Sequence, residues 1–344
     1  MEGKVLILTD GKAGHENQSK AFARALGCEY DLVEVHFKSK FAKALSYLFD
    51  GFGLLTLSLL QSNNRTIGQS NNSYSAVIGT GSGTFYAAKA LARKLGVKCG
   101  VVLYPRGYRI STFDCVLAPA FDNPAKAPNV IEIPANLVAN DEAFYAKGVA
   151  AFAEKSGFQI SDFKSSSPDD GKSKNAIAVI IGGPNKCSTM SPAWMKAQLD
   201  SIFAPITNHQ SPITNHQSPS TNHQAPSTQY WVTTSRRTPP EVEAVVDSYP
   251  WDYRLLYSKD HFNPIPAFVQ LAKRLYVTAE STGMLSESCT FGTAEVVALD
   301  NLNPGPHKFR RFVENLRKDG YVDGNRKVDL SAQFAEARRL MGIA

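Results

Sequence analysis

Residues 274–299 decide the fold and read RLYVTAESTGMLSESCTFGTAEVVAL. Two β-prone runs, RLYVT and EVVAL, flank a segment rich in hydroxyl side chains. Ser281 or Thr282 is a suitable N-cap for a helix in that segment, because its oxygen can accept from a free amide two or three residues further on. The sequence therefore predicts a strand, a turn, a short helix and a second strand.

A helix start of this kind can bind an anion without a lysine. Its first amides have no partner within the helix and lie at the positive end of the helix dipole. Gly283 leaves room for a ligand to approach the backbone, and Glu287 follows in the second turn, within reach of a sugar hydroxyl beside a bound phosphate. The alternative, which this stretch alone favours, is an ordinary capped helix without a ligand.

Strand and helix signals alternate through the rest of the chain as well. The first half contains the β-prone runs KVLILT, YSAVIGT, KCGVVLY, FDCVLAP and NVIEIPA, with helices predicted near residues 18–26 and 85–95. In the second half AIAVIIGGP and YWVTTSR precede the opening stretch. This alternation predicts an α/β protein with parallel sheets covered by helices.

The chain of 344 residues is long enough for two cores. We expect a first domain at 1–160, a linker at 161–175, a second domain at 176–304, and C-terminal helices at 305–344 that pack back across the domains. Residues 206–226 hold three copies of a seven-residue unit, ITNHQSP, ITNHQSP and STNHQAP, and are expected to form a disordered insertion. Its histidines could hold a metal loosely, but an expanded repeat without chemistry is the favoured interpretation.

Composition restricts the partners and the compartment. A formal charge of +6 spread over this length argues against nucleic acid as a partner. Five separated cysteines without a CxxC pair indicate reduced core residues rather than disulfides or a zinc site. The start MEGKVLILTDGKAG predicts a strand rather than a signal peptide, so we expect a cytoplasmic protein.

The most apolar segment covers residues 41–60. Asp50, Gly51 and Gly53 interrupt it, which argues against a membrane span. Lysines and aromatic residues at its start could rest on an anionic membrane surface, peripherally on the inner face. A buried core helix is the alternative, which this segment alone favours.

Polar loops follow the predicted strands. TDGKAGHENQS lies where clefts form in open α/β sheets, and His15 there could be a general base or only a helix cap. IIGGPNK has glycines that let amides close on a diphosphate, but it lacks the ending of a P-loop. In TTSRRTP, Arg236 or Arg237 could grip a phosphate. Further cleft candidates, from TDGKAGHENQS, GTGSGT and NPGPHKF, are Asp10, Gly14, Asn17, Gln18, Gly81, Ser82, His307 and Lys308.

Five motifs together resemble one family over nearly the full length. TDGKAGHENQS, IIGGPNK, VTTSRRTP, VTAESTGMLSESCTFGTAEVVAL and GPHKFRRFVENL stand in the order found in the elongated-mitochondria fission-protein family, whose bacterial members are often labelled nucleoside-diphosphate-sugar epimerases. That family looks like GT-B glycosyltransferases. The resemblance implies two Rossmann-like domains with parallel sheets facing a central cleft, the C-terminal one holding a nucleotide-sugar.

The resemblance also implies roles for single residues. The helix start at 281–284 would take the donor diphosphate, and Glu287 the ribose. His15, in a turn similar to the glycine-histidine loop of lipid-linked murein glycosyltransferases, would be the base on the acceptor side. The implied donor-site residues are Gly182, Gly183, Lys186, Ser235, Arg236, Ser281, Thr282, Gly283, Met284 and Glu287.

The implied function is a metal-independent, inverting glycosyltransferase of cell-envelope glycoconjugate synthesis. Its substrates would be a nucleoside-diphosphate sugar and an unknown acceptor, with no bound cofactor or metal. The alternative is a non-catalytic adaptor or nucleotide-binding module, since plant members of the family are associated with recruiting the fission machinery to mitochondria. The epimerase label has least support, because the chain lacks both a dinucleotide fingerprint after the first strand and a YxxxK pair.

Overall fold

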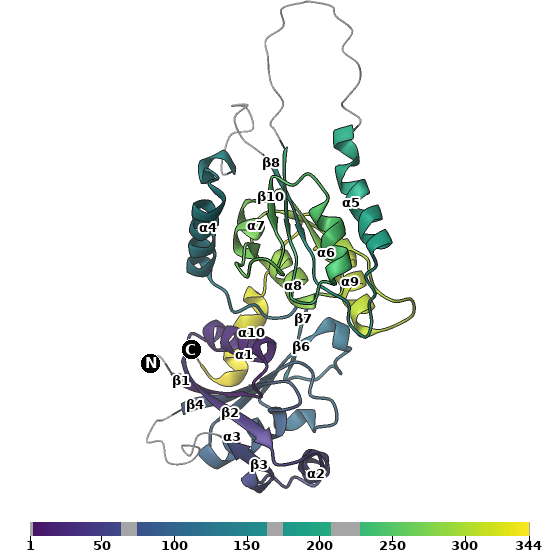
Figure 1. Cartoon of the computed structure of the whole chain (residues 1–344). Helices are drawn as coiled ribbons and strands as arrows, with labels where there is room; N and C mark the ends of the chain where they lie inside the picture. Colours follow the sequence, from purple (N-terminus) through teal and green to yellow (C-terminus); the bar gives the residue numbers. More distant parts are fainter. Residues whose placement is uncertain (1–2, 63–73, 164–174, 208–227, 344) are drawn as a thin grey trace, which may run out of the picture. The chain divides into compact units, whose positions relative to one another are not determined.

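The computed structural model describes residues 3–62, 74–163, 175–207 and 228–343, with the side chains of 205–207 left out. It divides into two compact units (Figure 1). The first unit contains Met1–Asn140 and Val328–Ala344, and the second contains Asp141–Lys327. The repeat at 206–226 lies outside the described residues, apart from its first two positions at the end of a helix.

The first unit is built on a seven-stranded sheet in the order β3-β2-β1-β4-β5-β6-β7, parallel except for β3. Its strands are β1 (Lys4–Thr9), β2 (Glu29–Phe37), β3 (Leu60–Ser62), β4 (Tyr74–Thr80), β5 (Lys98–Val102), β6 (Cys115–Pro119) and β7 (Val130–Ile133). Its α-helices are α1 (Ala13–Ala25), α2 (Lys40–Gly51), α3 (Phe85–Leu95) and α10 (Ser331–Met341). The central strands are almost wholly buried, which explains their continuous apolar runs.

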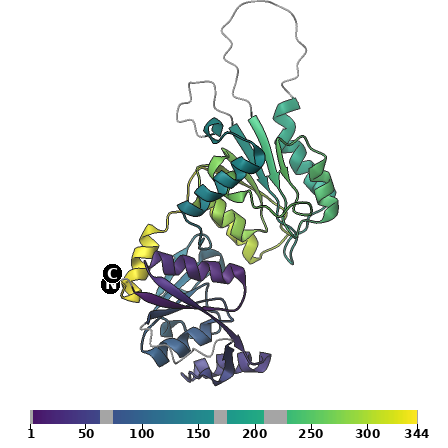
Figure 2. The ribbon, with the colours of Figure 1, turned by 60° about the vertical axis from the view of Figure 1, so that its left-hand side comes forward.

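Helix α10 returns to the first unit from the far end of the sequence. It contacts β5, β6 and β7, and the Arg338 Nε donates to the Ala25 carbonyl at the end of α1 at 2.7 Å. Figure 2 shows α10, in yellow, beside the purple α1. Met341 packs so closely on β5 that a Cβ at Gly100 would lie 3.1 Å from its Cε. The first unit is therefore completed by residues that follow the second one.

The second unit has a five-stranded, all-parallel sheet in the order β10-β9-β8-β11-β12. Its strands are β8 (Asn175–Ile180), β9 (Thr228–Thr233), β10 (Tyr253–Leu255), β11 (Arg274–Thr278) and β12 (Glu295–Leu299). Its α-helices are α4 (Glu142–Ser156), α5 (Pro192–Thr207), α6 (Pro240–Asp247), α7 (Ile265–Leu271), α8 (Thr282–Thr290) and α9 (Lys308–Lys318). This strand order is that of a Rossmann-type fold.

The expected strands and helices are confirmed, and the two parallel sheets confirm an α/β protein with two Rossmann-like domains. Three strands were not expected: β2, the short antiparallel β3 and the three-residue β10. Strand β2 reads EYDLVEVHF, and Val33 and Val35 are its only buried side chains, so its apolar signal is weak.

The division between the units differs from the expected one. Helix α4, expected in a domain spanning 1–160, belongs to the second unit, where it contacts α7. Phe152 of α4 lies 5.2 Å from the ring of Trp231 and 5.9 Å from that of Phe268, all fully buried. At the other end, α9 stays with the second unit and only α10 joins the first. Most of the expected linker at 161–175 lies outside the described residues.

Candidate functional site

Each sheet has one point at which its strand order reverses. In the first unit β1 has β2 on one side and β4 on the other, and in the second unit β8 lies between β9 and β11. The connections after β1 and β4 leave in opposite directions, as do those after β8 and β11, which opens a crevice at the carboxyl ends of each pair of strands. The predicted polar loops after β1, β4, β8 and β11 lie at these two reversal points.

The second unit has a pocket of about 530 Å³ at its reversal point. The loop after β8 and the start of α8 form most of its wall. The complete lining consists of Asn185, Lys186, Cys187, Arg237, Glu280, Ser281, Thr282, Gly283 and Phe309. The predicted donor residues Lys186, Ser281, Thr282 and Gly283 are therefore brought together here.

The first turn of α8 presents unoccupied amides. Ser281 is the N-cap residue, as predicted, but its side chain makes no capping hydrogen bond. Leu285 N–H donates to the Ser281 carbonyl at 3.0 Å, whereas none of the three preceding amides, at 282–284, has a hydrogen bond within the described chain. Two cationic side chains of the pocket, Lys186 and Arg237, have no carboxylate partner among the described residues. A diphosphate would meet amides, a helix dipole and two cations in this pocket.

The two glycines after β8 have a different role from the one predicted. Gly182 N–H donates to Thr278 Oγ1, and Gly183 N–H donates to Glu280 Oε1, each at 2.8 Å. Both amides are therefore already used inside the unit. An added Cβ at Gly182 would lie 2.0 Å from Glu280 Oε1, and one at Gly183 would lie 2.2 Å from the Arg237 carbonyl oxygen. Glycine is needed here for close packing of the loops that build the pocket.

The loop after β9 places the second arginine, not the first, in the pocket. Ser235 N–H donates to Thr238 Oγ1 at 2.9 Å, and Thr238 Oγ1 donates to the Gly182 carbonyl at 2.5 Å. This turn fixes the loop against the glycines. Arg237 lines the pocket, whereas Arg236 and Ser235 do not.

Four other predicted residues of the second unit lie outside the pocket lining. Glu287 accepts from the buried Tyr145 hydroxyl at 2.9 Å. His307 is the N-cap of α9, with Nδ1 accepting from Arg310 N–H at 3.3 Å and Nε2 facing the Asn303 carbonyl at 3.1 Å. Met284 follows the lining residues in α8, and Lys308 lies over the ring of Phe309.

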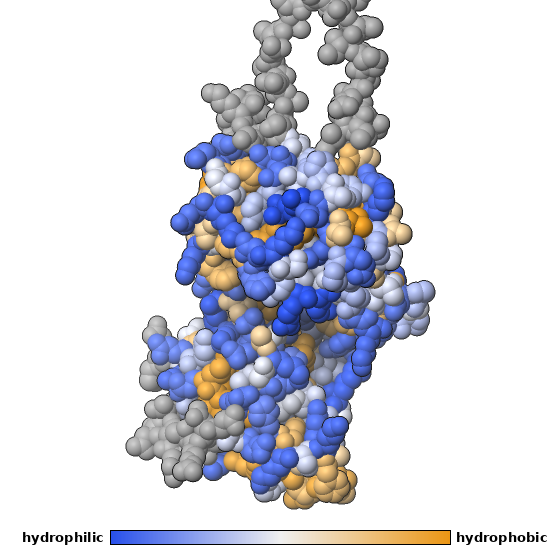
Figure 3. Space-filling view, viewed as in Figure 1, coloured by the Kyte–Doolittle hydropathy of each residue, from blue (hydrophilic) through white to orange (hydrophobic). Residues whose placement is uncertain are grey.

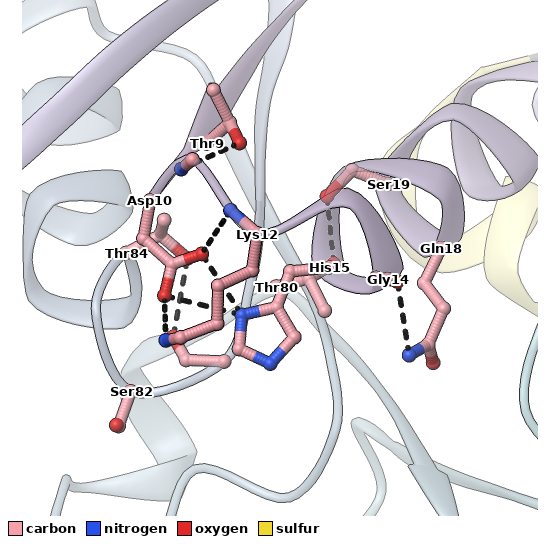
Figure 4. Close-up of polar contacts among 12 residues, drawn as sticks. Thr9, Asp10, Lys12, Gly14, His15, Gln18, Ser19, Thr80, Ser82 and Thr84 are labelled. Atoms are coloured by element: carbon pink, nitrogen blue, oxygen red, sulfur yellow. Dashed lines mark hydrogen bonds and ion pairs between the residues drawn. The ribbon is translucent and has the colours of Figure 1, made fainter. Parts of the chain in front are cut away.

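The first unit has a histidine and an aspartate paired after β1. His15 Nδ1 lies 3.0 Å from Asp10 Oδ1, and Lys12 Nζ lies 2.5 Å from Asp10 Oδ2 (Figure 4). The Asp10 side chain is only 7% exposed, and that of His15 is 23% exposed. With Nδ1–H held by the carboxylate, Nε2 is the nitrogen that can accept a proton.

The loop after β4 closes over this pair. A Cβ at Gly81, which has φ +82°, would lie 2.4 Å from His15 Cε1. A Cβ at Gly83 would lie 2.7 Å from Asp10 Oδ2. The glycines of GTGSGT thus let the loop pack on the His15 ring and the Asp10 carboxylate. The adjacent Ser82 hydroxyl accepts from Lys43 Nζ at 2.9 Å.

The charge of the pair is set by opposing effects on Asp10. Burial raises the pKa of Asp10, but the hydrogen bonds and charges of Lys12 and His15 lower it by more, so the pKa lies below its ordinary value. Asp10 is therefore ionised near neutral pH. The other candidates are less closely involved: Gly14 and Asn17 are exposed, and the Gln18 Nε2 donates to the Gly14 carbonyl at 3.4 Å, away from Asp10 (Figure 4).

Sequence reasoning missed four pocket residues: Asn185, Cys187, Glu280 and Phe309. Each lies within or beside a quoted motif. Glu280 had the clearest signal, because it stands between a buried strand and the N-cap of a helix.

These features define a two-domain α/β protein made of two Rossmann-like units, with polar loops at the reversal point of each sheet. The chain belongs to the mitochondrial fission ELM1 family, whose model matches residues 13–337. A search of curated proteins found no match.

Several solved structures are similar to this chain. S. aureus MnaA with UDP is 12% identical with a TM-score of 0.46, covering 98% of this chain and 89% of that one. UDP-GlcNAc 2-epimerase from Neisseria meningitidis bound to UDP-GlcNAc is 10% identical with a TM-score of 0.48, covering 98% of each chain. Acinetobacter baumannii MurG is 13% identical with a TM-score of 0.45, covering 98% of this chain and 92% of that one.

Proposed function

We propose that this protein is a nucleotide-sugar-dependent glycosyltransferase of GT-B type that acts in cell-envelope glycoconjugate synthesis. The observation that carries the proposal is the uncapped start of α8, where Thr282 and Gly283 have unoccupied amides and line a pocket together with Lys186 and Arg237. These groups suit the diphosphate of a nucleoside-diphosphate sugar, because they bind negative charge without a metal ion. We therefore assign binding of the nucleotide-sugar donor to the second unit.

The first unit is assigned the acceptor. His15 Nε2 takes the proton from an acceptor hydroxyl, while Asp10 holds the ring through Nδ1–H and stabilises the imidazolium that forms. The acceptor oxygen forms a bond to the anomeric carbon as the bond from that carbon to the diphosphate oxygen breaks. The departing nucleoside diphosphate keeps that electron pair, and its charge is stabilised by the amides of α8 and by the two cations. One displacement of this kind inverts the anomeric configuration.

The setting proposed for this reaction is the cytoplasmic face of an anionic membrane, which the protein contacts peripherally. Among the described residues, no helix combines the length and the apolar character needed to span a bilayer. Four side chains of α2 and the turn after it form an exposed apolar surface, here called the α2 surface, visible in orange at the bottom of Figure 3. They are Phe41, Leu48, Phe52 and Leu54, which are 72%, 54%, 74% and 56% exposed.

The charges around the α2 surface are suited to anionic lipid. Lys38 and Lys40 are exposed beside it. The only acidic residue between positions 38 and 62 is Asp50, which is buried and accepts from Lys89 Nζ at 2.7 Å. Apolar side chains beside lysines, without an exposed acid in the segment, favour the headgroup region of an anionic bilayer.

A thermal-shift screen with uridine, cytidine, guanosine and deoxythymidine diphosphates tests the donor assignment. A ligand at 100 times its dissociation constant stabilises the protein by about 2.7 kcal/mol, so one of the four should raise the melting temperature. Donor hydrolysis, followed with the sugar nucleotide of the best base, then tests catalysis. No shift with any of the four would reject the nucleotide site and favour the adaptor, and binding without turnover would favour a nucleotide-binding module.

A further inference from the structure

Glu280 is a buried carboxylate in the wall of the candidate diphosphate pocket. Glu280 is only 2% exposed, yet it lines the pocket beside Ser281, the N-cap of α8. A carboxylate next to a diphosphate site repels the ligand, so its presence needs a reason in the geometry of the pocket. None of the roles assigned above uses it.

The carboxylate joins the ends of three neighbouring strands. Oε1 accepts from Gly183 N–H at 2.8 Å, in the loop after β8, and from the Thr278 hydroxyl at 3.2 Å, at the end of β11. Oε2 accepts from Asn301 Nδ2 at 2.7 Å, just after β12. Because β8, β11 and β12 are adjacent in the sheet, one side chain holds together the loops that form the pocket.

These loops carry the groups that would bind the diphosphate. Lys186 lies three residues after Gly183, and the unoccupied amides of α8 begin two residues after Glu280. The loop after β8 is also tied to the loop after β12 through Thr189 N–H, which donates to the Asn301 carbonyl at 3.0 Å. Displacement of the Glu280 side chain would therefore move both sides of the pocket.

The sequence makes room for this side chain at one position. A Cβ at Gly182 would lie 2.0 Å from Glu280 Oε1. Any other residue at 182 would push the carboxylate away from the Gly183 amide. The glycine and the glutamate therefore form a matched pair.

We propose that Glu280 is a positioning residue, which holds the loop after β8 and the start of α8 in the arrangement that binds a diphosphate. This inference rests on the proposed function for the identity of the ligand. It assigns to Gly182 the role of admitting the carboxylate, and to Asn301 the role of anchoring it from the third strand.

The effect of the conservative variant Glu280→Gln can be predicted from these hydrogen bonds. In Glu280→Gln one oxygen can still accept from Gly183 N–H, but an amide nitrogen then faces Asn301 Nδ2. Asn301 Oδ1 is buried and has no partner in the described part of the chain. Rotation of the Asn301 amide would turn this oxygen toward the glutamine nitrogen and restore the contact. Glu280→Gln should therefore rescue what Glu280→Ala loses.

The test measures the affinity of the full chain for inorganic pyrophosphate by calorimetry, well below the melting temperature of every variant. Glu280→Ala and Gly182→Ala should each weaken binding at least tenfold, and Glu280→Gln by no more than about threefold. The double variant should be no worse than the poorer single one, because both remove the same contact. Glu243→Ala is the matched control: this buried carboxylate accepts from the Thr234 hydroxyl and does not line the pocket.

Hydrogen exchange of the peptide containing Gly182 and Gly183 gives a second readout that needs no ligand. Exchange should be faster in Glu280→Ala than in the wild type, and near the wild-type rate in Glu280→Gln and Glu243→Ala. Unchanged exchange in Glu280→Ala would overturn the proposal, as would faster exchange with unchanged pyrophosphate affinity. If the wild-type protein binds no diphosphate, the proposed function is rejected, and the positioning role of Glu280 is rejected with it. Faster exchange in Glu280→Ala would in that case show only that Glu280 orders the loop after β8.

Discussion

His15 and Asp10 are held in one orientation, with Nδ1 3.0 Å from Oδ1 and 3.2 Å from Oδ2 of the carboxylate. If His15 is the base, His15→Ala should slow sugar transfer by about 10²–10⁴-fold, because the acceptor proton then has no positioned acceptor. Nucleotide affinity should stay near the wild-type value, since the pocket lies in the other unit. A transfer assay beside calorimetry checks both, and a His15→Ala variant that cannot bind nucleotide would contradict the assignment of donor and acceptor.

The lowered pKa of Asp10 predicts how its contribution to stability depends on pH. A carboxyl whose pKa is lower in the folded state stabilises that state above its unfolded pKa of about 3.9, and the contribution is lost as pH falls through the folded pKa. Asp10→Asn should therefore lower the free energy of unfolding at pH 7 by about 1–3 kcal/mol. Urea unfolding should show this difference shrinking below about pH 4. A difference that grows toward acid would contradict the assigned direction.

Two adjacent arginines provide a matched pair for the pocket. Arg237 lines it and Arg236 does not. Arg237→Ala should weaken binding of the best nucleoside diphosphate by about 1.5–3 kcal/mol, the range for a hydrogen bond to a charged group. Arg236→Ala, which removes the same charge one residue away, should cost well under 1 kcal/mol. Titration calorimetry measures the loss of affinity in each variant. A larger loss in Arg236→Ala than in Arg237→Ala would restore Arg236 as the phosphate ligand.

Glu287 is predicted to hold the ribose, although it also accepts from Tyr145. Glu287→Ala should weaken nucleotide affinity by about 1.5–3 kcal/mol. Tyr145→Phe removes the hydrogen bond to Glu287 but keeps the carboxylate, and should leave that affinity within about twofold. Affinities can be measured by calorimetry and stabilities by urea unfolding. Equal losses of stability in both variants, with no change in affinity, would make Glu287 a structural partner of Tyr145.

The α2 surface should bind anionic vesicles. The double variant Phe41→Ser and Phe52→Ser should reduce co-sedimentation with phosphatidylglycerol-containing vesicles at least tenfold, because it removes the two most exposed aromatic side chains of that surface. Binding should weaken as salt rises. Phe144→Ser, in the second unit, removes another exposed aromatic residue and is the control. Equal recovery of the wild type with neutral and anionic vesicles would rule out the proposed contact.

The central strands could be predicted because parallel strands buried on both faces need continuous apolar runs. KVLILT and AIAVI show this clearly. Edge strand β10 could not be predicted, because its three residues form a strand only through pairing with Trp231, Val232 and Thr233 of β9. The placement of α4 in the second unit depends on the packing of Phe152 against residues more than 70 positions away, which no local pattern contains.

The candidate site was predictable to the level of the loop. Strand ends in an open parallel sheet mark where polar segments converge, so the loops after β1, β4, β8 and β11 could be chosen from sequence. Which side chain of a loop faces inward depends on local turns. The Ser235–Thr238 turn selects Arg237 over its neighbour, and the use of the Gly182 and Gly183 amides depends on two side chains nearly 100 residues further on.

The return of α10 makes the first unit discontinuous and leaves the second as one unbroken segment. During synthesis, residues 141–327 are complete before the ribosome adds the helix that the first sheet still lacks. Until α10 is synthesised, the surfaces of β5, β6 and β7 that it contacts therefore stay uncovered. A premature stop near Val328 would accordingly harm the unit made first and spare the one made later.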